Sequence, residues 1–371
     1  MNGLSTLLER ASARRHALSR DELVALLGLA DPGEIAALHA AAYAVKVRHS
    51  GRLVSLRGII EMGNVCAKDC YYCGIRKGND CVGRFELDEE AVLRAVRRNI
   101  DLRYGSLVLQ SGEIASEKHT AFIERILRKI DELGGGAIGV TLSLGEQSEE
   151  TYARWRAAGA HRYLLRIETS SPELYAKLHP ADHSFERRVD CLRLLRKCGY
   201  QVGSGVMSGL PGQTLDDLAG DILFFRDLDL DMIGMGPYIP HHDTPLGRDI
   251  PFTPDYAADH LRLGLNMIAA TRLFLHDVNI ASTTALQALA DDGREQGVLA
   301  GANVIMPNIT DTEYRRSYQL YENKPCLDEN AEQCRFCLER RLAAIGETIN
   351  WGARGDSPHY AARNPDNVQG L

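Results

Sequence analysis

Residues 53–73 read LVSLRGIIEMGNVCAKDCYYC. The first part, residues 53–62, is an apolar, strand-like run, and Cys66, Cys70 and Cys73 follow it with the spacing C-x3-C-x2-C. Three thiolates in one tight loop can hold three irons of a [4Fe–4S] cluster, which leaves the fourth iron open to an external ligand. Structural zinc usually takes four ligands from paired cysteines, and this loop offers three. The loop therefore favours an iron–sulfur cluster over zinc or a disulfide.

Beyond this stretch, short apolar runs alternate with longer amphipathic segments. The predicted strands are 53–62, 106–112, 137–144, 162–169, 202–210, 231–240, 277–282 and 304–308. The predicted helices between them are 89–103, 117–133, 149–158, 185–198, 215–228, 254–274 and 284–290. This alternation indicates βαβ units and a parallel sheet, and the number of strands favours an α/β fold of the (β/α)8 TIM-barrel type. A doubly wound open sheet is the alternative architecture.

The segments before and after the predicted barrel differ from it. Residues 1–50 are predicted to be helical and to pack on the barrel, with Ser19 as an N-cap and Glu22 completing a capping box. The barrel is assigned to residues 51–310. Residues 311–371 are predicted to be a C-terminal extension that is charged and contains cysteine.

The composition limits the classes of function. The chain has 371 residues, 44% hydrophobic and 25% charged, which is typical of a soluble globular protein with a large core. The net charge of −7, without a block of lysine and arginine, argues against nucleic acid as a partner. The chain has neither a run of apolar residues long enough for a membrane span nor the apolar segment of a signal peptide. We therefore expect a cytoplasmic protein whose nine cysteines are reduced thiols or metal ligands.

In a barrel of this type, functional side chains collect on the loops that follow the strands. The first three cysteines follow the first predicted strand, so their position fits a site. The second strand ends in LQSGE, residues 109–113. This segment is either a plain strand-to-loop turn or a place where the backbone meets a ligand. The candidate residues in it are Gln110, Ser111, Gly112 and Glu113.

The fourth predicted strand ends in a charged pair. Arg166 and Glu168 are two residues apart, so both side chains point to the same face of the strand. Such a pair is costly to bury unless it is paired or bound to a ligand. It forms either an internal salt bridge or a site in which the guanidinium holds a carboxylate and the carboxylate holds a cationic group. Arg188, near the start of a later helix, is a second candidate for binding a carboxylate.

The fifth predicted strand is rich in glycine. Residues 203–212 read GSGVMSGLPG and include Met207. The segment does not fit a dinucleotide fingerprint, because the third glycine is misplaced and no acidic residue closes the motif. The glycines either pack closely or let a ligand lie against the strand. After the sixth strand, His241 and His242 are neighbours, and on an extended chain we expect their side chains to point apart rather than share a metal ion.

Further candidates lie near the seventh and eighth strands. Thr283 and Thr284 start a predicted helix, where they either cap it or line an anion site. Met306 lies in the eighth strand. Tyr314, Tyr318 and Tyr321 have the spacing of a packed helical stripe, although Tyr318 could instead reach a ligand.

A second set of three cysteines lies near the C-terminus. Cys326, Cys334 and Cys337 have the spacing C-x7-C-x2-C. They could hold an auxiliary iron–sulfur cluster. Zinc with a fourth ligand, or no metal at all, is the alternative.

Together these segments resemble a known family. The spacing of the first cysteines, with Tyr72 before the last of them, resembles the signature of the radical S-adenosylmethionine (SAM) enzymes. Further segments resemble the HydE family of [FeFe]-hydrogenase maturases, which are biotin-synthase-like radical SAM enzymes. These segments are CGIR 73–76, YLLRIET 163–169, GLPGQT 209–214, GPYIPH 236–241, GANVIMPN 301–308, YQLY 318–321 and the late cysteines.

The resemblance implies a set of roles for the candidate residues. The first three cysteines would be catalytic and bind a [4Fe–4S] cluster that cleaves SAM to methionine and a 5′-deoxyadenosyl radical. The cofactor-binding residues would be Tyr72, Gln110, Ser111, Gly112, Glu113, Arg166, Glu168, Arg188, Met207 and Tyr318. The substrate would contact Thr283, Thr284 and Met306. The late cysteines would hold the auxiliary cluster.

The resemblance also implies a substrate and partners. The substrate would be an organometallic iron–carbonyl–cyanide–cysteine complex, and the product would lead to the diiron subsite of the hydrogenase H-cluster. The partners would be other hydrogenase maturases, a scaffold GTPase and a tyrosine lyase. Two alternatives stay open: another biotin-synthase-like reaction, such as the mutase reaction of methylornithine synthase, and a non-catalytic iron–sulfur protein.

Overall fold

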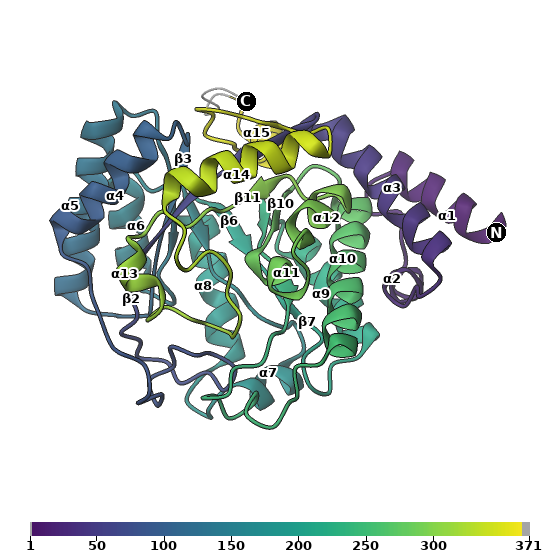
Figure 1. Ribbon diagram of the computed structural model, residues 1–371, viewed down its shortest axis with the longest axis horizontal. Coiled ribbons are helices and arrows are strands. Elements are labelled where there is room, and N and C mark those ends of the chain that lie inside the picture. Colours follow the sequence, from purple (N-terminus) through teal and green to yellow (C-terminus); the bar gives the residue numbers. More distant parts are fainter. Residues whose placement is uncertain (1, 366–371) are drawn as a thin grey trace.

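A computed structural model describes residues 2–365, and a curled parallel sheet lies at its centre with helices around it (Figure 1). The order of the strands in this sheet is β12-β1-β11-β10-β8-β6-β5-β4-β3-β2. They are β1 (Leu53–Leu56), β2 (Gly58–Gly63), β3 (Ser106–Ser111), β4 (Gly139–Ser143), β5 (Arg162–Leu164), β6 (Gln201–Ser204), β8 (Met232–Ile233), β10 (Asn279–Ser282), β11 (Val304–Ile305) and β12 (Thr348–Ile349). Every pairing between neighbours in this order is parallel.

The sheet closes on itself through its first two strands. Only Arg57 separates β1 from β2, and β1 pairs with β11 while β2 pairs with β3. A further parallel bridge joins Ile59 to Asn308. Residues 53–63 therefore pair with β11 on one side and with β3 on the other, which closes the barrel. The (β/α)8 barrel architecture predicted from the sequence is confirmed, and the doubly wound open sheet is excluded.

Helices join the strands and cover the outside of the sheet. They are α4 (Glu89–Asp101), α5 (Glu117–Gly134), α6 (Glu149–Ala157), α7 (Pro172–Leu178), α8 (Phe185–Lys197), α9 (Leu215–Asp227), α10 (Pro254–Leu275), α11 (Thr284–Leu289) and α12 (Gly293–Leu299). The longer ones begin at a side chain that accepts a hydrogen bond from a backbone N–H of the first turn. These caps are Asp88, Ser116, Ser148, Ser184, Thr214 and Thr253.

Each predicted strand and helix of the barrel has a counterpart with shifted ends, but the predicted strands 53–62, 202–210 and 231–240 are each divided in two. The predicted strand 202–210 is divided into β6 and β7 (Met207–Ser208), and β7 pairs with β9 (Gly236–Pro237) in a separate two-stranded sheet. Gly205 lies between β6 and β7, and a Cβ atom there would lie 2.0 Å from the carbonyl oxygen of Gly234. Close packing of the backbone therefore accounts for this glycine.

Three helices precede the barrel: α1 (Asn2–Ala13), α2 (Arg20–Leu27) and α3 (Pro32–Ser50), at the right of Figure 1. The predicted capping box of α2 is present, with Ser19 and Glu22 bonded reciprocally. Helix α2 contacts α9, and α3 contacts α10. The buried apolar residues of these helices belong to the same apolar cluster as the barrel. The division into segments 1–50, 51–310 and 311–371 stays a prediction.

The C-terminal part contributes α13 (Thr312–Arg315), α14 (Ala331–Ala344), β12 and α15 (Pro358–Arg363). Residues just before α15 cover the end of the barrel at which the strands begin. Asp356 accepts hydrogen bonds from Arg162 and from Gln201, which are the first residues of β5 and β6. Arg57 donates to the carbonyl oxygen of Gly355 at 3.2 Å. With this end covered, ligands reach the barrel from the opposite end.

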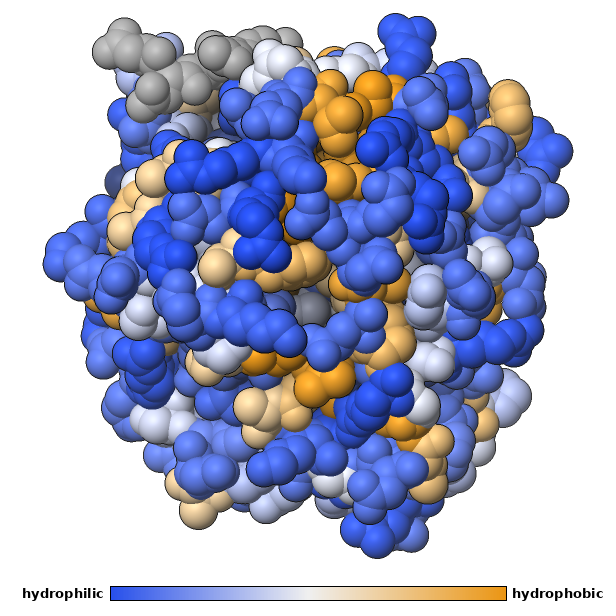
Figure 2. Space-filling view, turned by 90° about the vertical axis from the view of Figure 1, so that its left-hand side faces the viewer, coloured by the Kyte–Doolittle hydropathy of each residue, from blue (hydrophilic) through white to orange (hydrophobic). Residues whose placement is uncertain are grey.

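None of the helices within residues 2–365 combines the length and apolar character needed to cross a membrane. The face seen in Figure 2 is largely hydrophilic, with only small apolar groups between the polar side chains.

Candidate functional site

A cavity of about 340 Å³ opens where the strands end. It is lined by every site residue predicted from the sequence except Cys337. Those residues come from ten separate segments of sequence between Cys66 and Cys334, and closure of the barrel brings them to one place. Other lining residues that the sequence analysis did not single out include Glu61, Lys68, Arg294 and Lys324.

Cys66, Cys70 and Cys73 lie in the loop that follows β2. The backbone N–H of Glu113 donates to the Cys66 sulfur at 3.3 Å, so the end of β3 contacts the loop. Between them, Gly112 has no room for a side chain, because a Cβ atom there would lie 2.2 Å from the carbonyl oxygen of Val65. The backbone at the end of β3 therefore packs directly against the cysteine loop, and a ligand contact at this segment stays a prediction.

The chemistry of the three thiols fits an iron–sulfur cluster. None of them is in a disulfide, and all three line the cavity. Burial raises the pKa of Cys66, raises that of Cys70 to about 12 and raises that of Cys73 well above its usual range. The metal-free thiols therefore keep their protons at neutral pH, and iron would replace those protons on binding. Three sulfur ligands with an adjacent open cavity match a cluster that has one iron free.

A network of charges joins the cysteine loop to the barrel wall. Lys68 lies 3.1 Å from Glu146 and 3.4 Å from Glu113. Arg188 lies 2.9 Å from Glu146 and has a side chain only 10% exposed. Burial raises the pKa of Glu113, and the nearby charges of Arg188 and Lys68 oppose that rise. Arg188 is thus already paired with Glu146. A ligand carboxylate would have to share the guanidinium with Glu146 or displace Glu146 from it.

Arg166 and Glu168 form the internal pair that the sequence left open, and they also line the cavity. The guanidinium lies 3.0 Å from the Glu168 carboxylate and donates to the carbonyl oxygen of Val206 at 2.9 Å. Strand β5 ends before them, and Glu168 has a φ of 68°, a conformation that non-glycine residues rarely adopt. Strained backbone of this kind is concentrated at functional sites. The side chain of Arg166 is 32% exposed against 10% for Arg188, so Arg166 is the more available of the two arginines.

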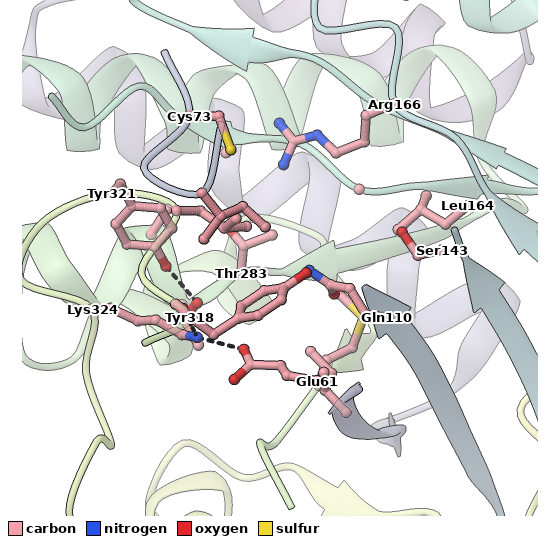
Figure 3. Close-up of a pocket in the computed structure, with 18 of the residues that line it drawn as sticks. Glu61, Cys73, Gln110, Ser143, Leu164, Arg166, Thr283, Tyr318, Tyr321 and Lys324 are labelled. Carbon is pink, nitrogen blue, oxygen red and sulfur yellow. Dashed lines mark hydrogen bonds and ion pairs between the residues drawn. The ribbon is translucent and has the colours of Figure 1, made fainter. Parts of the chain in front are cut away.

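The segment after β11 forms one wall of the cavity. The Tyr318 side chain extends toward Gln110, and Lys324 forms an ion pair with Glu61 (Figure 3). Lys324 also donates to the carbonyl oxygen of Tyr318 at 2.8 Å. Helix α13 ends at Arg315, so Tyr318 does not continue a helical stripe as the tyrosine spacing predicted. The loop instead directs this ring into the cavity.

Thr283 and Thr284 differ in their contacts. Thr283 is the N-cap residue of α11, but its side chain makes no capping hydrogen bond, and its hydroxyl has no partner in the described part of the chain. The Thr284 hydroxyl lies 2.6 Å from that of Tyr321. Thr283 therefore lies at the predicted helix start, but its side chain does not cap the helix. Its free hydroxyl at the cavity is available to a ligand.

The remaining predicted residues also line the cavity. Ser111 donates to the carbonyl oxygen of Gly112, and Met207 and Met306 add apolar surface. The Tyr72 hydroxyl lies 3.4 Å from Nε2 of His179, and its ring packs edge-on against that histidine. Burial raises the pKa of Tyr72 well above its usual range, so it stays a neutral hydroxyl.

The late cysteines are only partly brought together. Cys326 and Cys334 line the cavity and hydrogen-bond to each other, and this bond lowers the pKa of Cys326 to about 7. Cys337 does not line the cavity, and its sulfur is a hydrogen-bond partner of Arg341. Two of the three predicted ligands thus face the same cavity as the first cysteine set.

The histidine pair is arranged differently from the sequence expectation. The chain turns at this point, since the Thr244 N–H donates to the His241 carbonyl oxygen, and the two rings stack with centroids 5.0 Å apart. Donor atoms of His241, His242 and Asp243 lie within 4.8 Å of one another. The expectation that the side chains point apart is therefore wrong. Nδ1 of each ring already has a protein partner, because the Asp243 N–H donates to His241 and His242 bonds to Glu322.

Some lining residues could have been found from the sequence. Glu61 is a charged residue inside an otherwise apolar strand, and Lys68 lies between two cysteines. A buried charge in either place needs a partner or a ligand. Lys324 and Arg294 carry no such signal, because nothing local shows that they face the barrel.

Comparison with known proteins agrees with this geometry. The model of the Radical SAM superfamily matches residues 60–225. The [FeFe] hydrogenase maturase subunit HydE of Thermotoga maritima is 41% identical over 350 residues, which cover 94% of this chain and 97% of that protein. The 3-methylornithine synthase of Methanosarcina acetivorans is 27% identical over 290 residues, which cover 78% of this chain and 79% of that protein. The crystal structure of methylornithine synthase (PylB) has a similar fold, with a TM-score of 0.77 and 22% identity over 93% of this chain and 98% of that chain.

Proposed function

Because this chain belongs to the radical SAM superfamily, and within it to the family of the [FeFe]-hydrogenase maturase subunit HydE, we propose that it cleaves SAM to convert an iron–carbonyl–cyanide–cysteine precursor of the hydrogenase diiron subsite. The observation that carries this proposal is the cavity itself. Three thiols, several cationic side chains and a free threonine hydroxyl face the same space.

Cys66, Cys70 and Cys73 would hold the [4Fe–4S] cluster. When bound, this cluster supplies the electron that splits SAM into methionine and a 5′-deoxyadenosyl radical. The buried thiols supply three ligands, and the contact from the Glu113 N–H to the Cys66 sulfur keeps one of them oriented. Hydrogen bonds of this kind to a cluster ligand also tune its reduction potential.

Residues around the cysteine loop would bind SAM. Arg166 is our choice for the methionyl carboxylate, because its guanidinium is accessible and its Nε is without a partner in residues 2–365. Glu168 lies beside it and would hold the ammonium or sulfonium end. Arg188 would be a second contact for the carboxylate. The remaining contacts would come from Tyr72, Gln110, Ser111, Gly112, Glu113, Met207 and Tyr318.

The substrate would lie deeper in the same cavity, against Thr283, Thr284 and Met306. An iron complex that carries cyanide is anionic, and the free Thr283 hydroxyl offers it a hydrogen bond. Lys324 and Arg294 add positive charge to the walls. The segment that carries Tyr318 and Tyr321 closes one side, which excludes water from a reactive carbon radical.

Three further features belong to this proposal. Cys326, Cys334 and Cys337 would hold an auxiliary iron–sulfur cluster. The scaffold GTPase and the tyrosine lyase of hydrogenase maturation would be functional partners. The protein would work in the cytoplasm, where its nine free cysteines stay reduced.

A carbon-skeleton mutase of the methylornithine synthase type is the alternative enzyme. Its support is weaker, because identity to the synthase is 27% over 78% of the chain against 41% over 94% for HydE. A non-catalytic iron–sulfur protein is disfavoured, because such a carrier has no need for a cavity of about 340 Å³ beside its cluster.

The test is an in vitro maturation assay with reconstituted protein. SAM, dithionite and the iron–carbonyl–cyanide–cysteine complex are added anaerobically, and both 5′-deoxyadenosine and hydrogenase activity are measured. We expect the iron complex to accelerate 5′-deoxyadenosine release and the mixture to activate apo-hydrogenase. SAM cleavage that lysine stimulates and the iron complex does not would instead support the mutase.

A further inference from the structure

The cysteine loop is closed at its base by reciprocal contacts between residues 62–64 and 83–87. Gly63 forms an antiparallel bridge with Glu86, and the Leu87 N–H donates to the carbonyl oxygen of Met62 at 2.7 Å. The Asn64 side chain donates to the carbonyl oxygen of Gly83 at 2.8 Å and accepts from the Phe85 N–H at 2.8 Å. The loop that carries the three thiols therefore leaves and re-enters the fold at one place.

Arg84 lies at this place and its side chain reaches back into the loop. Its Nη1 donates to the carbonyl oxygens of Asn64 at 2.7 Å and Ile75 at 2.8 Å. Its Nη2 donates to those of Arg76 at 2.6 Å and Asn79 at 2.9 Å. Each terminal nitrogen of a guanidinium carries two hydrogens, so these four bonds use all of them.

The four carbonyl groups come from both sides of the cysteines. Asn64 precedes Cys66, whereas Ile75, Arg76 and Asn79 follow Cys73. For Asn64, Ile75 and Asn79, which are buried, Arg84 is the sole hydrogen-bond donor to the carbonyl oxygen that residues 2–365 provide. A buried carbonyl group without a donor is costly, so the guanidinium stabilises the loop only in a conformation that gathers all four.

We propose that Arg84 is the positioning residue that folds the cysteine loop into its cluster-binding conformation before iron arrives. It touches none of the cysteines through a hydrogen bond and acts through the backbone on either side of them. The proposal rests on the family assignment of the cluster and is independent of the hydrogenase role.

Other contacts of the loop support a division of roles. Asp69 accepts a hydrogen bond from the Gly78 N–H at 2.8 Å and pairs with Arg76, which closes a smaller turn within the loop. Its own N–H donates to Nε2 of His183 at 3.1 Å, which attaches the loop to the barrel wall. The Asn64 side chain joins the two ends of the loop at its base, whereas the Arg84 side chain binds backbone carbonyls on both sides of the three cysteines. A lysine at this position offers three hydrogens on a single nitrogen and cannot reproduce a planar set of four.

Hydrogen exchange of the metal-free protein, followed by mass spectrometry, tests this role. The variants are Arg84→Met and Arg84→Lys. Arg97→Met is the matched control, because Arg97 lies on the nearby helix α4 and makes only an exposed ion pair with Glu90. We expect peptides that span residues 64–87 to exchange about tenfold faster or more in Arg84→Met, with barrel peptides unchanged. Arg84→Lys should fall between Arg84→Met and the unmodified protein.

The cluster provides a second measurement. After anaerobic reconstitution, iron should leave Arg84→Met several-fold faster than the unmodified protein when a chelator is added, and the electron paramagnetic resonance signal of the reduced cluster should change. Arg84→Lys should partly restore both properties. Unchanged exchange of residues 64–87 in Arg84→Met would overturn the proposal. Faster exchange throughout the barrel would also overturn it, since Arg84 would then support global stability rather than the loop. Neither result depends on whether the protein matures hydrogenase.

Discussion

Cys70 is buried, whereas Cys66 and Cys73 are partly exposed, and burial raises the pKa of Cys70 to about 12. Replacing it removes one of three sulfur ligands, and no nearby side chain of the loop supplies another. We expect Cys70→Ala to abolish SAM cleavage, measured as 5′-deoxyadenosine by liquid chromatography, and to lower bound iron. The control is Cys81→Ala, because Cys81 is exposed and does not line the cavity. Cleavage by Cys70→Ala near the normal rate would refute the ligand assignment.

Asp221 provides a pH-dependent prediction. It is buried on α9, it accepts from the Ser170 N–H at 2.6 Å, and its second carboxylate oxygen has no partner in the described chain. Burial raises the pKa of Asp221 from 3.8 to about 7. The unfolded chain releases this proton near pH 4, whereas the folded protein keeps it to about pH 7, so the group lowers stability progressively across this interval.

Asp221→Asn removes that titration and keeps an oxygen for the Ser170 N–H. We expect the variant to gain stability over the unmodified protein as the pH rises from 4 to 7, by no more than roughly 4 kcal/mol, and the gain to be constant above that. Urea unfolding at pH 5 and pH 8 measures it. Asp216→Asn on the same helix is the control, because the hydrogen bond from Arg20 lowers the pKa of Asp216, so its effect should not change above pH 4. A gain for Asp221→Asn that is equal at both pH values would contradict the prediction.

Single residues were predictable where a local pattern carried the signal. The cysteine spacing and the pair Arg166 and Glu168 are readable within a few positions, and the structure places both at the cavity. Lys324 was missed because its partner Glu61 lies 263 positions away in the sequence. Only the course of the chain between them brings the two charges together.

The segment from Tyr318 to Cys337 shows how an element can differ from its spacing pattern. The tyrosine spacing predicted a helical stripe, but α13 ends at Arg315 and the following loop enters the cavity wall. Helix α14 then begins at a capping box formed by Asn330 and Gln333. The turn of the helix places Cys334 toward the cavity and leaves Cys337 outside its lining.

Replacing Cys337 therefore tests the late cysteines without changing a residue that lines the cavity. We expect Cys337→Ala to keep SAM cleavage within about twofold of the normal rate, since this partly exposed thiol lies outside the cavity lining and its loss disturbs little packing. Iron bound beyond the first cluster should fall. Anaerobic iron analysis and a 5′-deoxyadenosine assay check both statements. If cleavage disappears in this variant, the late cysteines are essential for the first step.

The assembled molecule is held together partly by one buried ion pair. Lys46 on α3 pairs with Glu347 just before β12, and both side chains are 0% exposed. The Tyr43 hydroxyl donates to the same carboxylate at 2.5 Å. This group joins the N-terminal helices to the C-terminal strand, which extends the sheet beyond β1.

Removing one member of this pair leaves the other buried without a counter-charge. We expect Lys46→Met to lower the free energy of unfolding by about 3–5 kcal/mol, measured by denaturant titration. The double variant Lys46→Met with Glu347→Gln should recover part of that loss. Arg10→Met, which breaks an exposed ion pair with Glu22, should cost less than about 1 kcal/mol. If Lys46→Met and Arg10→Met lowered the free energy of unfolding equally, the buried pair would contribute no more than the exposed one, which would contradict the prediction.

The amino-acid sequence was sufficient for the order of strands and helices, the barrel architecture and the first cysteine loop. Each depends on periodicity or spacing within a few residues, and local backbone preferences and burial of one face make such patterns readable. Tertiary structure decided the remaining features. These are the cavity itself, the four hydrogen bonds from Arg84 to backbone carbonyls, the pairing of Lys324 with Glu61 and the position of Cys337 outside the cavity lining. They depend on contacts between segments that are distant in the sequence. Those contacts exist only once the barrel has closed, with β1 paired to β11 and β2 paired to β3.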